Sequence, residues 1–347
     1  MHSTLSNNMT PNAKNRIEQQ LTFLKANKNN LTIDADTHIS DIANLEDPLR
    51  EKYLESDNYY HGKPISAKDL MAEMNMAGVD MCLSWQNPAT TVYEIDHEKN
   101  FEKLFKANQY IYDMATKYPD RIIPAGWTDP KNLGVELAIK MAEICVKKFG
   151  FFIVKMNPAQ NEYPIDSDAV VSVFNKIIEL GGVPAFHFGG DTPYTTAEGF
   201  EVMAKIHPEH PVIGVHMGGG GPSYIDGEIH YHKARELGLR MPNIKFIQSA
   251  KRDTHMESDF IAYELAGEPY SKNIFCASDA PYGRQSWNFG GFRLMFDSLK
   301  NGEKHTDRRL KENPNLFNEN VAQNYLGRNF AEFTIDGYER LLKKYTK

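Results

Sequence analysis

The chain has 347 residues, of which 39 are Lys or Arg and 46 are Asp or Glu, and its formal net charge is −7. Hydrophobic residues make up 41% and charged residues 24%, a composition that is ordinary for a folded protein and excludes a disordered chain. The acidic balance excludes a nucleic-acid binder held by bulk positive charge. No apolar run approaches the roughly 18 residues of a membrane span. We therefore expect neither a nucleic acid nor a membrane as a partner.

The N-terminal segment and the cysteines bear on the cellular compartment. The first thirty residues are polar and rich in Asn, without the apolar stretch of a secretory signal. The three cysteines, Cys82, Cys145 and Cys276, lie far apart and form no C-x-x-C motif. An odd number of dispersed cysteines argues against a disulfide framework. We therefore expect a cytoplasmic protein with reduced thiols.

Short apolar runs that end in polar or glycine-rich segments predict the strands. These runs cover residues 31–36, 79–85, 121–126, 151–156, 183–188, 212–217, 244–249 and 274–279. Helical periodicity separates most of them, clearly at 70–74, 101–115, 133–144 and 170–178 and more weakly at 225–237, 260–265 and 292–299. Strand and helix thus alternate at intervals of about 30 residues, which predicts a parallel sheet.

Eight such units predict the α/β class and a (β/α)8 TIM barrel. An open, doubly wound sheet is the alternative, and it is disfavoured because no G-x-G-x-x-G follows the first strand. Residues 1–30 are predicted to form an N-terminal arm, residues 31–335 the barrel, and residues 336–347 the end of the C-terminal helices. The arm and these helices could serve a homodimer. Residues 40–65 read as a long loop, and a long loop at that rim is expected to cover a site.

Polar and ionisable residues gather where the predicted strands end. They are Asp34, Asp36 and His38 after the first strand, Lys155 at the fourth, His187 at the fifth, His216 at the sixth and Asp279 at the eighth. Active sites of such barrels lie at the carboxyl ends of the strands. Two histidines and two carboxylates that converge there suit a divalent cation. For His187 or His216 taken singly, a hydrogen-bonded core histidine is the alternative.

Four motifs at these strand ends resemble a known family. They are D-x-H at 36–38, F-H-F-G-G at 186–190, G-V-H-M-G-G-G at 214–220 and C-A-S-D-A-P-Y-G at 276–283. Together they resemble the amidohydrolase superfamily, and within it the amidohydrolase-related group that includes aminocarboxymuconate semialdehyde decarboxylase and related aromatic-acid decarboxylases and hydrolases. The resemblance covers about residues 31–335.

The resemblance implies roles for individual residues. The metal ligands would be Asp36, His38, His187 and Asp279, with Asp36 at the place of the first histidine of the family's H-x-H motif. Asp279 would also handle a proton, and His216 would be either the base or the polarising group beside the metal-bound water. We expect zinc as the cofactor, with manganese or iron as alternatives. Lys155 falls where some superfamily members place a carboxylated lysine, and we expect it instead either to support the metal ligands from behind or to face the substrate.

The resulting expectation is a metal-dependent hydrolase that uses a metal-activated water on a small substrate with a carboxylate or carbonyl group. A non-oxidative decarboxylase of an aromatic or unsaturated acid is the first alternative. A di-metal enzyme that activates oxygen with iron or manganese, and a barrel that binds a ligand without turnover, are the others. The expected substrate contacts lie in loops at the barrel mouth, with Lys251 and Arg252 as partners of a substrate carboxylate. They are Trp85, Trp127, Lys155, Phe188, Lys251, Arg252, Tyr282 and Arg284.

Overall fold

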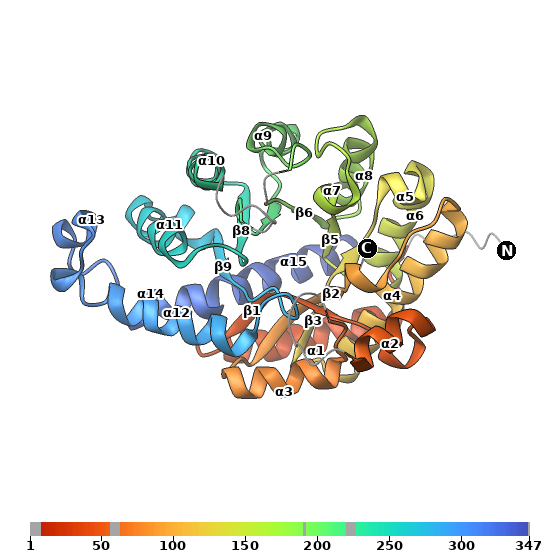
Figure 1. Ribbon diagram of the computed structural model, residues 1–347, viewed down its shortest axis with the longest axis horizontal. Helices are drawn as coiled ribbons and strands as arrows, with labels where there is room; N and C mark the ends of the chain where they lie inside the picture. The colour runs from red at the N-terminus through yellow and green to blue at the C-terminus, as the bar shows by residue number, and fades with distance from the viewer. Residues whose placement is uncertain (1–7, 56–62, 190–191, 220–226, 346–347) are drawn as a thin grey trace.

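The strands run parallel to one another in two hydrogen-bonded sets. The computed structural model describes residues 8–55, 63–189, 192–219 and 227–345 (Figure 1). One set has the order β1 (Ile33–Ile39), β2 (Met81–Gln86) and β3 (Ile122–Pro124). The other has the order β4 (Gly126–Trp127), β5 (Ile153–Met156), β6 (Val183–His187), β7 (Val212–Val215), β8 (Ile244–Gln248) and β9 (Ile274–Cys276). Within each set, every strand pairs with the next along the chain, as repeated right-handed crossovers require.

Two further contacts make the sets one barrel. Only Ala125 separates β3 from β4, and its N–H donates to the Ser84 carbonyl at 3.0 Å, so β3 and β4 together are the third predicted strand. At the other edge Thr37 bridges Ala280 in parallel, and the His38 N–H donates to the Ala280 carbonyl at 2.7 Å. The last strand therefore returns to the first. The predicted (β/α)8 TIM barrel is confirmed.

Helices follow the strands and surround the barrel, as Figure 1 shows. They are α3 (Ala67–Ala77), α4 (His97–Lys117), α5 (Pro130–Leu133), α6 (Val135–Glu143), α7 (Pro158–Asn161), α8 (Asp168–Glu179), α9 (Ala197–Ile206), α10 (Gly227–Arg240), α11 (Asp253–Ala266) and α12 (Gln285–Leu299). The expected helices do not include α9, a helix of 10 residues whose Thr196 side chain caps its start.

The prediction that residues 40–65 form a long loop is wrong in part. It contains the short helix η1 (Ile42–Asn44) and helix α2 (Asp47–Glu55), while residues 56–62 lie outside the described residues. Residues 46–55 contain four acidic residues and no glycine, so that stretch carries helical propensity although it has no long apolar face. The segment therefore forms a partly helical structure beside the barrel mouth.

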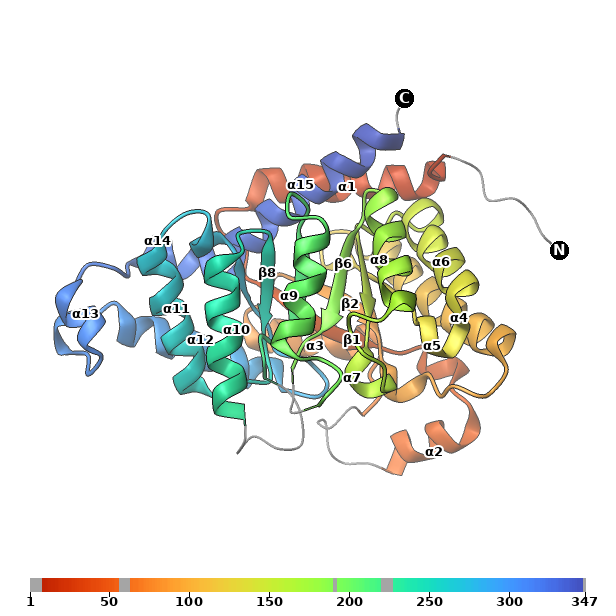
Figure 2. The ribbon, with the colours of Figure 1, turned by 90° about the horizontal axis from the view of Figure 1, so that it is seen from above.

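Helix α1 (Pro11–Asn27) and helix α15 (Asn329–Tyr345) lie side by side at one end of the molecule, as Figure 2 shows. The buried Arg16 guanidinium donates to the carbonyls of Phe149 and Gly150 at 3.0 and 2.8 Å, just before β5. The Gln20 amide donates to the Ile122 carbonyl at 2.6 Å, at the start of β3. Because these acceptors precede the strands, the predicted arm covers the amino-terminal end of the barrel. The chemistry of such barrels lies at the opposite end.

The C-terminal part of the chain adds α13 (Arg308–Glu312) and α14 (Glu319–Gln323) before α15. All seven residues of β1 are buried, as are the six of β2, because helices cover the outside of the barrel and side chains fill its inside. In the part of the chain that the structure describes, no helix combines the length and the apolar character that crossing a membrane requires.

Candidate active site

The predicted ligands meet at the carboxyl-terminal end of the barrel. Asp36 and His38 belong to β1, His187 ends β6, His216 directly follows β7, and Asp279 lies just beyond β9. The Nε2 atom of His38 lies 3.4 Å from Oδ1 of Asp279 and 3.7 Å from Oδ1 of Asp36. Asp36, His216 and Asp279 each offer one ligand atom, and these atoms all lie within 4.8 Å of one another. The His187 ring centroid lies 4.5 Å from that of His216, so the five side chains form one cluster.

Hydrogen bonds at the back of the cluster orient two of the imidazoles. The Ser249 hydroxyl donates to Asp36 Oδ2 at 2.9 Å, so the His216 Nδ1–H, 2.8 Å away, donates to this hydroxyl oxygen. The His38 Nδ1 atom lies 2.8 Å from the Gln86 carbonyl, which only accepts, so Nδ1 also carries the hydrogen there. Both rings consequently keep a lone pair on Nε2. Such outer hydrogen bonds are the usual way in which proteins set the tautomer of a metal-binding histidine.

Asp36 is held from both sides. The Trp85 indole N–H donates to Oδ1 at 2.8 Å, and Ser249 donates to Oδ2. Ser249 was not predicted as a site residue, although it is the polar residue that ends the seventh predicted strand. Its position at a strand end is the one signal in the sequence that pointed to it.

Burial governs the charges of the cluster. Burial, followed by repulsion from Asp36, raises the pKa of Asp279 to about 6, while the neighbouring His38 acts in the opposite direction. Burial also lowers the pKa of His187 and that of His216 well below the ordinary value, which keeps both rings neutral. Because the two imidazoles are neutral, they do not compensate the negative charge of the two neighbouring carboxylates. A bound cation would offset that charge. The donor set therefore fits a divalent metal ion.

The backbone is strained where the cluster forms. His216 has a φ of 79° and Asp279 a φ of 58°, and the neighbouring Met217 and Ala250 have values of 46° and 48°. None of the four is a glycine, so each adopts the left-handed region against its own preference. Strain of this kind concentrates at functional sites, where the surrounding structure holds it in place.

Lys155 lies behind the cluster and is 1% exposed. Its ammonium group is 3.9 Å from Asp36 Oδ1 and lies over the rings of Trp85 and Trp127, at 4.4 and 5.0 Å from their centroids. Burial lowers its pKa, while Asp36 and Asp279 act in the opposite direction. Trp85 and Lys155 thus pack around one carboxylate of the cluster, and Trp127 packs against Lys155.

The other predicted contacts lie in different surroundings. The Tyr282 ring stands edge-on to His38, with centroids 5.5 Å apart. Phe188 is buried and stacks on Phe200 of α9. Lys251 is buried and pairs with Asp259, while Arg252 pairs with Glu228 and Arg284 with Glu73. The structure therefore brings Trp85, Trp127, Lys155 and Tyr282 to the cluster, and it gives the three basic residues carboxylate partners within the protein.

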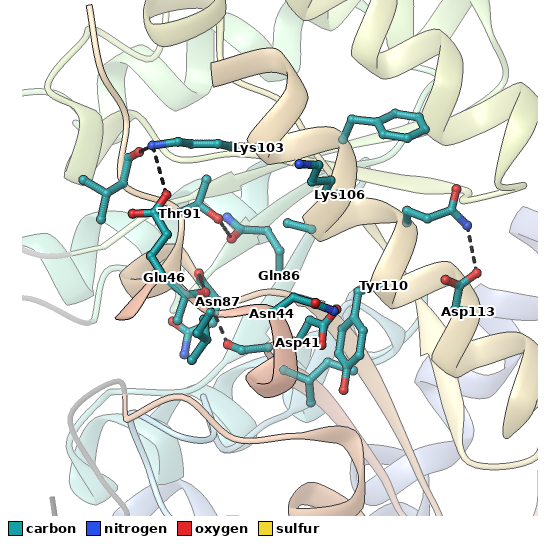
Figure 3. A pocket seen from close by; sticks show the side chains of 18 residues that line it. Asp41, Asn44, Glu46, Gln86, Asn87, Thr91, Lys103, Lys106, Tyr110 and Asp113 are labelled. Atoms are coloured by element: carbon teal, nitrogen blue, oxygen red, sulfur yellow. Dashed lines mark hydrogen bonds and ion pairs between the residues drawn. The ribbon is translucent and has the colours of Figure 1, made fainter. Parts of the chain in front are cut away.

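A cavity of about 650 Å³ lies beside the cluster, between the segments that follow β1 and β2 and helix α4. Figure 3 shows Asp41, Asn44 and Tyr110 in the lower part of the view and Lys103 and Lys106 in the upper part. The Tyr282 hydroxyl donates to Oδ1 of Asn87, which lines this cavity, at 3.0 Å. Tyr282 therefore links a wall of the cavity to the cluster. The segment after β1 was expected to cover a site, and it forms one side of this hollow.

Solved structures of decarboxylases have the same fold. The 5-carboxyvanillate decarboxylase of Novosphingobium aromaticivorans, complexed with manganese and 4-hydroxy-3-methoxy-5-nitrobenzoic acid, has a TM-score of 0.61 at 12% identity over 88% of this chain and 96% of that chain. The 5-carboxyvanillate decarboxylase of Sphingomonas paucimobilis has a TM-score of 0.58 at 15% identity over 87% and 98%. The dihydroxybenzoic acid decarboxylase of Polaromonas, with bound manganese and 2-nitroresorcinol, has a TM-score of 0.54 at 14% identity over 82% and 94%. At these identities the likeness establishes the fold.

Sequence comparison establishes the family. Among curated proteins, none matches this chain significantly. The family model described as amidohydrolase matches residues 33–300, which is more than half of the chain and runs from the first strand of the barrel through its last crossover helix. The chain therefore belongs to the amidohydrolase family.

Proposed function

We propose that the protein catalyses the non-oxidative decarboxylation of an aromatic carboxylic acid with the help of a bound divalent metal ion. The observation that carries the proposal is the buried cluster of two carboxylates and three imidazoles beside the rings of Trp85, Trp127 and Tyr282. The decarboxylases of 5-carboxyvanillate and dihydroxybenzoic acid with the same fold support it. They favour decarboxylation over hydrolysis, which the residues alone suggested first.

The proposed ligands are Asp36, His38, His187 and Asp279, and His216 lies within reach as a further ligand. We propose manganese ahead of zinc, because mixed carboxylate and imidazole donors suit Mn²⁺ and two of the similar structures contain it. When bound, the ion would hold the acid group of the substrate and offset the charge of the two aspartates.

The residues of the chain supply the proton and the orientation. The reaction breaks the bond between the ring and the carboxylate, releases carbon dioxide and places a proton on the ring carbon. Asp279 is the proposed donor, because it lies at the proposed metal site and its side chain is 13% exposed at the barrel mouth. His216, kept neutral by burial, would orient the acid group. Tyr282, edge-on to His38, offers an aromatic wall for the ring of the substrate.

The test is a direct assay of the metal-loaded protein. Purified protein, stripped of metal and reloaded with Mn²⁺ or Zn²⁺, is incubated with 5-carboxyvanillate and with a set of dihydroxybenzoic acids. We expect release of carbon dioxide and the matching phenol in equal amounts, at least tenfold faster with the bound metal than without it. Asp279→Asn is the matched inactive control. Absence of carbon dioxide release from the whole set, with metal bound in full, would contradict decarboxylation of this substrate class.

Hydrolysis is the second candidate, because the family model is that of the amidohydrolases. The same cluster could activate a water molecule for attack on an amide or lactone carbonyl. Product analysis separates the two reactions. Hydrolysis forms a new carboxylic acid and no carbon dioxide, whereas decarboxylation consumes an acid and releases carbon dioxide.

A further inference from the structure

The backbone turn that carries His216 is strained, so surrounding contacts must hold it in place. His216 and Met217 are consecutive residues in the left-handed region, with φ values of 79° and 46°. Behind them the Gly218 N–H donates to the Phe188 carbonyl at 2.9 Å, and the Gly219 N–H donates to the His216 carbonyl at 2.8 Å. Those bonds hold the backbone after the turn. The Met217 carbonyl has a different partner.

That partner is the side chain of Lys251, which was predicted from the sequence to meet a substrate. Its Nζ atom donates to the Met217 carbonyl at 3.1 Å and to Asp259 Oδ2 at 2.5 Å. It also lies 5.0 Å from the centroid of the Tyr231 ring. The side chain is fully buried, with no exposed surface. An ammonium group with these partners around it is engaged inside the protein rather than at the mouth.

Asp259 anchors this lysine to the helices outside the barrel. Its Oδ1 accepts from the Arg235 Nε–H of α10 at 2.5 Å, and its Oδ2 also accepts from the Gln248 amide of β8 at 2.7 Å. Asp259 itself belongs to α11. The network therefore connects helices α10 and α11 and strand β8 to one backbone carbonyl, that of Met217.

We propose that Lys251 is a positioning residue that holds the His216 turn through the Met217 carbonyl, and that Asp259 fixes the lysine in place. A strained turn persists only where its surroundings determine it from several sides. With the turn fixed, the hydrogen bond from His216 Nδ1 to Ser249 keeps Nε2 directed at the cluster. Only the kinetic part of the test rests on the proposed decarboxylation.

The central variant is Lys251→Met, which keeps most of the volume and removes the ammonium group. Asp259 retains its bonds from Arg235 and Gln248, so the carboxylate is not left unpaired and we expect the variant to fold. Lys251→Gln is the second variant if folding fails, because its amide still offers a donor to Asp259 but is too short to bridge both acceptors. Lys251→Arg is the conservative variant, which restores donors for both.

Lys245→Met is the matched control. Lys245 is also a largely buried lysine of β8, and its ammonium group donates to Asn273, outside the proposed network. It lies near the start of the strand, toward the amino-terminal end of the barrel, whereas Lys251 follows the end of the strand. A general effect of removing a buried lysine from this part of the barrel would appear in both variants.

The first measurement needs neither metal nor substrate. In protein labelled with ¹⁵N-histidine, the ring signals of His216 are identified by their loss in His216→Gln. We expect Lys251→Met and Lys251→Gln to shift or broaden these signals, and Lys251→Arg to restore them. Lys245→Met should leave them as in the unaltered protein. Unchanged His216 signals in a folded Lys251→Met protein would overturn the proposal.

The second measurement is turnover of the Mn²⁺-loaded protein with the acid that the assay above identifies. We expect kcat to fall at least tenfold in Lys251→Met with KM changed less than threefold, because the turn orients a group and does not bind the substrate. A rise in KM with kcat unchanged would assign Lys251 to the substrate and overturn the proposal. If no acid is decarboxylated, the proposed function fails while the histidine signals still decide the role of Lys251.

Discussion

The Nε2 atom of His38 lies 3.4 Å from Oδ1 of Asp279, although these residues belong to the first strand of the barrel and to the segment after the last. The contact exists because the barrel closes through the pairing of Thr37 with Ala280. Closure of the fold and assembly of the proposed metal site are thus the same event. A change that loosens the seam between β1 and β9 would also separate two of the proposed ligands.

Asp279→Asn should remove most of the affinity for Mn²⁺ while the barrel stays folded. Losing a partner behind a ligand typically costs a factor of about 10–100 in metal affinity, and loss of a proposed ligand should exceed that range. Calorimetric titration of the metal-free protein with Mn²⁺, together with circular dichroism, checks this. Full retention of affinity would remove Asp279 from the ligand set.

Ser249→Ala should weaken Mn²⁺ binding by about 10–100-fold, because the hydroxyl orients both Asp36 and His216 from behind. Ser172→Ala is the control, since Ser172 lies on the exposed side of α8 and its hydroxyl donates to the carbonyl one turn earlier. The same titration compares the two. Equal affinities in both variants would show that Ser249 does not orient the ligands.

Chelation of the metal should lower the melting temperature without unfolding the protein. Binding at a concentration about 100 times the dissociation constant stabilises a folded state by about 2.7 kcal/mol, a modest share of the stability that a barrel of this size draws from its core. Thermal melts with and without EDTA, in the presence of excess Mn²⁺ or none, measure the shift. Complete loss of structure on chelation would instead indicate a structural metal.

Lys245 should make the stability of the protein depend on alkaline pH. Burial lowers its pKa from 10.5 to about 8, so the charged form is disfavoured in the folded state. The resulting cost is present below pH 8 and disappears as the pH rises toward 10.5, because the unfolded chain then loses its proton as well. Relative to Lys245→Met, the unaltered protein should therefore gain about 2 kcal/mol between pH 7 and pH 10. Denaturant melts of both proteins at these pH values test the sign, and a constant difference would contradict it.

The sequence predicts the strands well because each is a short apolar run between polar segments. The fourth predicted strand, 151–156, contains β5 (Ile153–Met156), and the fifth, 183–188, contains β6 (Val183–His187). Helix α9 is missing from the expected elements although Ala197, Phe200, Met203 and Ala204 are buried at helical spacing. The break between β3 and β4 is missing as well, since a local bend at Ala125 leaves no mark on hydrophobic periodicity.

The candidate site also combines features that the sequence predicts with features that it does not predict. The position of a residue at a strand end is a property of the local sequence, and it pointed to Asp36, His38, His187, His216 and Asp279. The hydrogen bonds of Ser249 and the burial of Lys251 depend on contacts that only the folded protein makes. A basic residue directly after a strand, such as Lys251, gives the same sequence signal whether its side chain faces a ligand or a carboxylate inside the protein.

By itself, the order of apolar and polar segments determined a parallel barrel with ionisable residues at one rim. Only the tertiary structure decided which of those residues touch and which charges are paired inside the protein. The physical reason is that hydrophobic patterning is local and repeats along the chain, whereas hydrogen bonds and ion pairs such as that of Lys251 with Asp259 form when the barrel closes and the helices pack around it.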